Sequence, residues 1–192
     1  MSLKKWNISK PNKEKIAIMS DIYNIPAILA MLLQIRKISD NEIEDILFSD
    51  YELEDPFNFI DMDKAVVRIK QSIENFEKIC IYGDYDADGV TATSLMYLYL
   101  ENCGANVTYY IPNRKNEGYG LNIKAIDKLK SDGVSLILTV DNGISAINEV
   151  KYALNLGIDS VITDHHHVPE IMPEAVAIVD PHRKDCNSIF KN

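Results

Sequence analysis

The chain has 192 residues, of which 46% are apolar and 26% are charged. This length and composition suffice for a hydrophobic core, which excludes a disordered or coiled-coil protein. The formal net charge of −9 argues against a protein that coats nucleic acid through a basic surface. It does not exclude a nuclease, because a cluster of metal-binding aspartates is itself acidic.

The three cysteines are widely spaced and form neither a zinc pattern nor a disulfide framework. Free thiols are typical of a reducing compartment. The sequence has no apolar run long enough to span a membrane, and its first residues lack the apolar segment of a signal peptide. We therefore expect a soluble, cytoplasmic protein with no membrane partner.

The N-terminal region, residues 1–75, is predicted to be helical. All eight glycines lie at or after Gly83, which favours helices over tight hairpins before that point. One helix is predicted over 25–36 with Pro26 in its first turn, and a shorter one is predicted to begin with Asp40 as its cap. A third, amphipathic helix is indicated by apolar residues three or four positions apart: Met62, Val66, Ile69, Ile73 and Phe76. Because these residues need a surface to bury them, residues 1–75 should pack as helices on the domain that follows.

The pattern changes in residues 76–192, where short β-branched runs alternate with helical stretches. Strands are predicted over 78–83, 106–111, 135–140, 158–163 and 175–179, with helices near 90–102, 123–129 and 146–156. Continuous apolar strands separated by helices indicate a parallel sheet that is covered on both faces. The predicted fold class is therefore α/β, with a doubly wound, mostly parallel five-stranded sheet after the helical N-terminal region.

Carboxylates and imidazoles follow four of the five predicted strands. They are Asp84, Asp86 and Asp88 after the first strand, Asp141 after the third, Asp164, His165, His166 and His167 after the fourth, and Asp180 and His182 after the fifth. In a parallel sheet these positions lie along one edge, where ligands bind. Such a group of charges is unstable unless cations offset the repulsion among the carboxylates. The sequence therefore predicts a metal site at this edge.

Carboxylate and imidazole ligands without a thiolate favour Mn²⁺ or Mg²⁺ over structural zinc. Two such ions lie roughly 4 Å apart when one aspartate bridges them, and they serve in-line attack of an activated water on phosphorus. Asp141 is the natural bridge if its loop lies between those of the first and fourth strands. A helix that starts just after Gly89 would point its amide-rich end at the substrate anion. The sequence has no Walker P-loop, no G-x-S-x-G elbow and no dinucleotide glycine fingerprint, which removes the main competing α/β enzymes.

Each motif also has a structural interpretation. Asp84, Asp86 and Asp88 match the start of an EF-hand loop, although a strand precedes them where a helix should be, and they can also form turns or cap a helix. Residues 141–143 are a common turn sequence, and residues 164–167 can be a polar surface cluster. Their shared position at strand ends favours the metal site.

The motifs at residues 82–91, 140–143 and 164–166 resemble the first three motifs of the DHH phosphoesterase superfamily. Outside these motifs, residues 55–69, 110–121 and 177–183 are similar to the RecJ family of single-stranded-DNA-specific exonucleases. The resemblance covers essentially the whole chain. It implies that the metal ligands are Asp86, Asp88, Asp141 and His165.

Further roles follow from the same resemblance. Asp84 would be a catalytic residue that ligates or orients a metal ion, and His166 would contact the scissile phosphate. Arg114 and Arg183 are candidates for holding substrate phosphates through the guanidinium fork, and each is otherwise an ordinary surface arginine. Tyr119 can stack a base or fill a gap in the core.

The implied function is that of a metal-dependent phosphodiesterase, a 5′→3′ exonuclease that acts on single-stranded DNA in DNA repair and recombination. Two alternatives stay open: a phosphodiesterase of oligoribonucleotides or cyclic dinucleotides, and a non-catalytic DHH scaffold in a replication complex. The expected cofactors are Mn²⁺ or Mg²⁺, two per complete site. The expected partners are single-stranded DNA and other repair or single-strand-binding proteins.

Members of this family are longer, with a further metal-binding aspartate and a second domain. We therefore expect the chain to be an N-terminal fragment, truncated on the C-terminal side of its α/β domain. On this interpretation the fragment folds but is inactive by itself.

Overall fold

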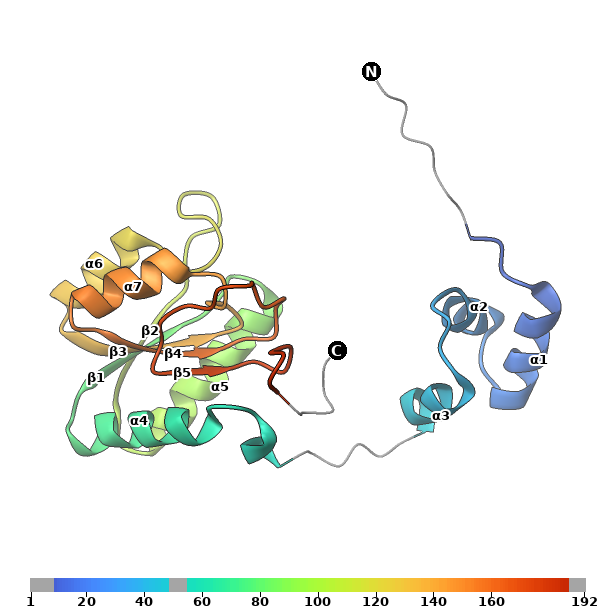
Figure 1. Cartoon of the computed structure of the whole chain (residues 1–192), viewed down its shortest axis with the longest axis horizontal. Coiled ribbons are helices and arrows are strands. Elements are labelled where there is room, and N and C mark those ends of the chain that lie inside the picture. The colour runs from blue at the N-terminus through green and yellow to red at the C-terminus, as the bar shows by residue number, and fades with distance from the viewer. Residues whose placement is uncertain (1–8, 49–54, 187–192) are drawn as a thin grey trace, which may run out of the picture. The chain divides into compact units, whose positions relative to one another are not determined.

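The computed structural model describes residues 9–48 and 55–186 (Figure 1). The N-terminal residues in which no signal peptide was found, and the C-terminal tail, lie outside the described residues. The chain divides into two compact units, Met1–Leu53 and Glu54–Asn192. We describe each unit by itself.

The described part of the first unit contains three helices: α1 (Lys13–Tyr23), α2 (Ala27–Ile35) and α3 (Asp40–Phe48). The sequence pattern did not indicate α1, which begins where the Asn12 side chain accepts hydrogen bonds from two backbone N–H groups. Pro26 precedes the first residue of α2 and is not within its first turn. Asp40 is the first helical residue of α3, and the cap is Ser39, whose N–H and hydroxyl both donate to the Glu42 carboxylate.

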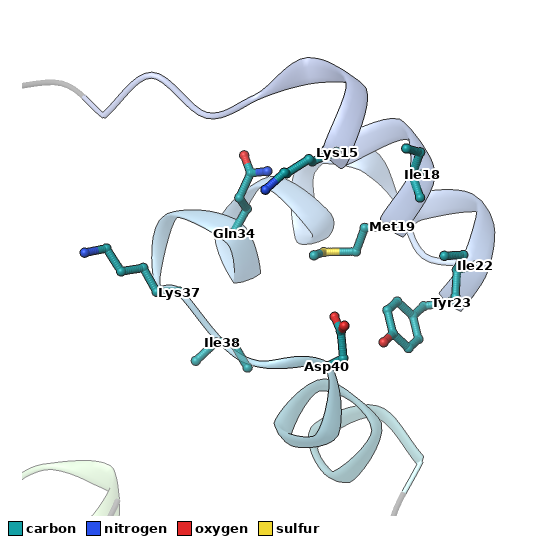
Figure 2. Close-up of a pocket in the computed structure, with 9 residues that line it drawn as sticks. All are labelled: Lys15, Ile18, Met19, Ile22, Tyr23, Gln34, Lys37, Ile38 and Asp40. Carbon is teal, nitrogen blue, oxygen red and sulfur yellow. The ribbon is translucent and has the colours of Figure 1, made fainter.

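A pocket of about 440 Å³ lies between α1, α2 and the start of α3 (Figure 2). Figure 2 shows Lys15 and Gln34 close together at one side of the pocket, and Tyr23 and Asp40 at another. The backbone N–H of Asn12 donates to the Gln34 side chain at 2.7 Å, which ties α1 to α2. Among the described residues no single helix is long and apolar enough to cross a membrane, and the bent pair of α1 and α2 meets that test on length and composition alone.

The second unit is built on a sheet of five strands: β1 (Lys78–Tyr82), β2 (Asn106–Tyr110), β3 (Val134–Val140), β4 (Asp159–Thr163) and β5 (Ala177–Val179). All neighbouring strands are parallel and their order is β2-β1-β3-β4-β5. The predicted parallel five-stranded sheet is thus confirmed. The chain builds outward from β1 to β2 and then crosses back to β3, so the boundary between β1 and β3 is a topological switch point, where ligands of such sheets bind.

Helices cover both faces of this sheet (Figure 1). One face packs against α6 (Ile123–Ser131) and α7 (Ile147–Asn155), and the other against α4 (Met62–Glu74) and α5 (Ala87–Asn102). Successive residues of β1 alternate between the two faces: Cys80 and Tyr82 join the core under α6 and α7, whereas Ile79 and Ile81 join the core under α4 and α5. The two buried faces explain why the strands read as continuous apolar runs.

Helix α4, which follows the 3₁₀ turn η1 (Pro56–Asn58), packs on the sheet as predicted. The Arg68 side chain fixes it through ion pairs to Asp159 at 2.7 Å and Glu77 at 2.8 Å. The prediction that Phe76 belongs to the buried face is wrong, because the helix ends at Glu74 and the Phe76 side chain is 78% exposed. The compact unit that holds the sheet includes α4, and a domain division between residues 75 and 76 stays a prediction.

Candidate metal centre

The loops after β1, β3 and β4 meet at the carboxyl edge of the sheet, beside the switch point. Carboxylate oxygens of Asp84, Asp86 and Asp141 lie within 4.8 Å of one another, and Asp141 also forms such a group with His165 and His166. The strand order β1-β3-β4 places the Asp141 loop between the other two. Asp141 therefore belongs to both donor groups, as a bridging ligand must.

The main chain of Asp141 adopts the left-handed conformation, with φ of 61°, directly after β3. Its carboxylate is 8% exposed and lies 2.9 Å from Nε2 of His165. Burial raises the pKa of Asp141, and the charges of Asp86 and Asp88 add to this effect although the bond to His165 opposes it. An ionised Asp141 is thus costly in the metal-free protein, and a cation would relieve that cost.

Asp86 is both a candidate ligand and the N-cap of α5. One of its carboxylate oxygens accepts hydrogen bonds from the backbone N–H groups of Gly89 at 3.0 Å and Asp88 at 2.9 Å. These bonds, that from Gly89 above all, lower the pKa of Asp86. The expected helix start after Gly89 is corrected: α5 begins at Ala87, so two amides of its first turn bind Asp86 and are not left for a substrate anion.

Gly89 allows the start of α5 to lie against the end of β1. A Cβ atom at this position would lie 2.6 Å from the backbone nitrogen and oxygen of Asp84. The Asp84 side chain is enclosed, with the residue 2% exposed, and its Oδ1 atom has no hydrogen-bond partner. A buried carboxylate oxygen without a partner is costly, and a cation at this position would satisfy it.

The structure does not place Asp88 in either donor group. Its carboxylate is 77% exposed and its Oδ2 atom lies 4.0 Å from Nε2 of His165. The predicted ligands Asp86 and Asp141 therefore share one donor group with Asp84. His165 shares the other group with Asp141 and His166, and Asp88 lies outside both.

Asp164 organises the edge, although the sequence analysis gave it no role. Its Oδ1 atom accepts hydrogen bonds from the backbone N–H groups of His165 and His166 and lies 2.6 Å from Nδ1 of His166. Its Oδ2 atom accepts from the backbone N–H of Ile144 at 2.9 Å, which joins the loop after β4 to the loop after β3. Burial lowers the pKa of His166, but the bond to Asp164 and its charge outweigh burial and raise it. The sequence signal for this role of Asp164 was its position directly before two histidines at the end of a strand.

Arg114 lies in the segment between β2 and α6, and it is exposed. Its guanidinium carbon lies 5.1 Å from the ring centroid of Tyr85, which belongs to the loop after β1. The Tyr85 ring in turn meets the edge of Tyr119, with centroids 6.3 Å apart. The Arg114 cation thus lies against the ring of Tyr85, the residue between Asp84 and Asp86.

The expectation that Arg183 binds a substrate phosphate is corrected by its surroundings. Its side chain is 8% exposed and forms ion pairs with Asp61 at 2.7 Å and with Asp185 at 2.8 Å. It also donates to the backbone oxygen of Ile178 at 2.7 Å. The Arg183 guanidinium therefore joins the start of α4 to the segment after β5, and it donates four hydrogen bonds within the protein.

The donor set of the edge fits a hard divalent cation. It consists of carboxylate oxygens and imidazole nitrogens without a thiolate, which is typical of Mn²⁺ or Mg²⁺ sites. The unpartnered Oδ1 of Asp84 and the raised pKa of Asp141 are the features that a bound cation would relieve.

The chain is similar to known proteins over most of its length. The profile of the DHH family, N-terminal domain, matches residues 78–191. The single-stranded-DNA-specific exonuclease RecJ of Bacillus subtilis strain 168 is 43% identical over 189 residues, which are 97% of this chain and 24% of that protein. The protein of the same name from Escherichia coli strain K12 is 41% identical over 127 residues, 66% of this chain and 22% of that protein.

Among solved structures, that of an exonuclease RecJ bound to manganese matches with a TM-score of 0.64 and 29% identity. The match covers 69% of this chain and 34% of that chain. The present chain thus spans about a quarter of the length of the curated relatives it matches. The profile match includes all five strands and every donor of the metal centre. The chain belongs to the DHH family.

Proposed function

We propose that this chain carries the metal-binding part of the active site of a RecJ-type exonuclease, which degrades single-stranded DNA in the 5′→3′ direction during DNA repair and recombination. The observation that carries the proposal is the pair of donor groups that share Asp141 at the switch point of the sheet. Similarity to RecJ of Bacillus subtilis over 97% of the chain supports the substrate class. The manganese in the solved relative supports Mn²⁺, or the similar Mg²⁺, as the cofactor.

In this proposal the ligands of two metal ions are Asp86, Asp88, Asp141 and His165, with Asp84 as a further ligand or as the residue that orients them. Asp88 is exposed enough for its side chain to turn toward His165, 4.0 Å away. When bound, the ions would neutralise phosphate oxygens and increase the acidity of a water aligned for attack. Asp141 would set the spacing of the two ions.

The other residues act on the phosphodiester directly. Nδ1 of His166 faces the Asp164 carboxylate, so Nε2, which lies 3.3 Å from the Tyr119 hydroxyl, is the ring nitrogen that would donate to an oxygen of the scissile phosphate. The raised pKa of His166 favours the doubly protonated ring that such a donor needs. Arg114 would bind a second phosphate through two parallel N–H groups.

The donors in the described residues leave the coordination shells of two cations incomplete. We therefore propose that the 192-residue chain by itself folds and binds metal but does not turn over DNA. In a RecJ-type protein, which is about four times as long as this chain, other parts would supply a further metal ligand and a basic DNA-binding surface. If the purified 192-residue chain hydrolyses DNA and its Asp141→Asn variant does not, the proposal that the chain alone is inactive is wrong.

The substrate class is tested by digestion of a matched set of substrates by the longest natural protein that contains this chain. The set comprises single-stranded DNA labelled at the 5′ or the 3′ end, the same sequence as a duplex, a short oligoribonucleotide and a cyclic dinucleotide, each with millimolar Mn²⁺ or Mg²⁺. We expect release of nucleotides from the 5′ end of single-stranded DNA alone. Preferred cleavage of the two small substrates would instead identify a small-nucleotide phosphodiesterase, and inactivity on all of them would indicate a scaffold.

We also propose that the protein acts in the cytoplasm together with other DNA-repair or single-strand-binding proteins. The free thiols of Cys80, Cys103 and Cys186 support a reducing compartment. Fractionation of cells with an antibody against the protein, followed by crosslinking, tests both statements.

A further inference from the structure

One tyrosine outside the DHH motifs contacts three loops of the metal centre. Tyr119 lies between β2 and α6, and its hydroxyl donates a hydrogen bond to the backbone oxygen of Asp141 at 3.1 Å. The Tyr119 hydroxyl oxygen also lies 3.3 Å from each ring nitrogen of His166. Its ring meets the Tyr85 ring edge to face, at 81°. Tyr119 therefore contacts the loops after β3, β4 and β1.

The contact with Asp141 holds a peptide in an uncommon conformation. A φ of 61° is disfavoured for an aspartate and persists only when neighbouring groups fix it. The Asp141 N–H donates to the backbone oxygen of Thr163 at 3.1 Å, and the Asp141 oxygen accepts from Tyr119. The main chain is thus held at both ends of the residue, which sets the direction of the Asp141 carboxylate.

The contact with His166 restrains the imidazole from a second side. Asp164 occupies the Nδ1 atom at 2.6 Å, and the Tyr119 hydroxyl stands against the same ring, with ring centroids 5.8 Å apart. Two contacts from different segments leave the ring less freedom to rotate than Asp164 alone would.

The backbone around Tyr119 is shaped to deliver this side chain. Gly118 and Gly120 on either side have φ of +82° and +77°, which glycine adopts without strain, and no atom lies within 4 Å of a Cβ built on either. The two glycines are therefore required for the backbone conformation and not for close packing. The Tyr119 hydroxyl points into the metal centre.

We propose that Tyr119 is a positioning residue for phosphodiester hydrolysis: its hydroxyl fixes the Asp141 main chain and the His166 imidazole relative to each other. This inference rests on the proposed function for its catalytic consequence. It adds to that function a link between Asp141, the proposed bridging ligand, and His166, the proposed phosphate contact. Tyr119, which makes this link, belongs to neither of their motifs.

The kinetic test compares Tyr119→Phe, which removes only the hydroxyl, with a matched control, Tyr109→Phe. Tyr109 lies on β2, is 60% exposed and has its ring against Tyr97, away from the metal centre. Loss of one hydrogen bond of ordinary strength should lower kcat on single-stranded DNA about tenfold. KM and the melting temperature should stay within error of the wild type, and Tyr109→Phe should match the wild type throughout. Wild-type kcat in Tyr119→Phe, or a rise in KM alone, overturns the proposal, the second because it identifies a DNA contact.

A second measurement separates this inference from the proposed function. Imidazole ¹H–¹⁵N spectra of the metal-free, DNA-free protein report the surroundings of each histidine, with His166 assigned by its Gln variant. We expect the His166 signals to move in Tyr119→Phe and not in Tyr109→Phe, and unmoved signals in Tyr119→Phe overturn the proposed contact. If the wild type does not hydrolyse single-stranded DNA, the proposed function fails, while these spectra still decide whether Tyr119 holds His166.

Discussion

The Nδ1 atom of His166 lies 2.6 Å from a carboxylate oxygen of Asp164, and the Asp164 side chain is 1% exposed. Because a carboxylate only accepts, Nδ1 carries the proton of this bond. The same carboxylate also accepts three backbone N–H groups from two loops. One buried charge thus sets both the orientation of the imidazole and the path of the main chain around it.

Replacing Asp164 by asparagine should therefore damage the site although the shape hardly changes. The new amide nitrogen must face either Nδ1–H of His166 or the N–H of Ile144, so a donor meets a donor. We expect turnover of single-stranded DNA to fall about 10- to 100-fold, together with a lower melting temperature. His167→Gln is the matched control, because His167 is exposed in the same loop and belongs to neither donor group. Equal activities of Asp164→Asn and His167→Gln would contradict the role of Asp164.

Asp141→Asn should stabilise the metal-free protein while it removes metal binding. The pKa of Asp141 is raised from 3.8, so the ionised form is disfavoured in the fold. The stability that a raised carboxyl pKa contributes is present at low pH and is lost as the pH rises through the folded value. The melting temperature of the variant should exceed that of the wild type by a few degrees at pH 7, and the excess should vanish below pH 3.8.

Addition of Mn²⁺ should reverse the order, because only the wild type gains stability from a bound ion. The control is Asp132→Asn, an exposed carboxylate at the end of α6, which should follow the wild type in both conditions. A metal-free Asp141→Asn protein that melts below the wild type at pH 7 would show that the Asp141 carboxylate stabilises the fold.

Gly89→Ala should push α5 away from β1. The added methyl group would lie 2.6 Å from the Asp84 backbone, and overpacking of this kind costs about 1–3 kcal/mol. Because the Asp84 backbone makes this contact and the Gly89 N–H binds the Asp86 carboxylate, Mn²⁺ affinity should fall together with the free energy of unfolding. Ser94→Ala, on an exposed position of α5, should change neither. Denaturant unfolding and metal titration of the two variants check this, and unchanged metal affinity in Gly89→Ala would contradict it.

Arg183→Ala should lower stability without weakening the binding of DNA. The substitution removes the Arg183 ion pairs with Asp61, which keeps its pair with Lys64, and with the exposed Asp185. Loss of hydrogen bonds to charged groups costs about 1–3 kcal/mol. Lys184→Ala, next to it and exposed, is the control. Arg183→Lys, which keeps the charge, provides a folded variant if the alanine variant does not fold. A raised KM for DNA at unchanged stability would return Arg183 to the phosphate-binding role.

The sheet and the position of the metal centre could be predicted because both depend on local patterns. Apolar β-branched runs specify strands that are buried on both faces, and the parallel order brings the ends of these runs to one edge. Asp84, Asp86, Asp141 and His165 could therefore be placed together from their positions after β1, β3 and β4.

Other features depend on contacts between distant segments, which no local pattern carries. From the sequence, Arg183 resembles an ordinary surface cation. Its burial depends on a contact with Asp61, which is 122 positions away in the sequence. The Tyr119 hydroxyl reaches Asp141 only because the loops after β2 and β3 approach each other in the fold. Helix α1 is a different case: Ile16, Met19 and Tyr23 recur at helical spacing, so its sequence carried a signal that the prediction missed.

Whether two metal ions share Asp141 is tested most directly by calorimetric titration of Mn²⁺ into the metal-free form of the longest natural protein that contains this chain. The wild type should bind two ions, and Asp141→Asn should lose measurable binding of both, because one carboxylate belongs to both donor groups. Asp132→Asn should retain the wild-type stoichiometry. Retention of one full-affinity site in Asp141→Asn would show that the ions do not share this ligand, and retention of both would remove Asp141 from the metal centre.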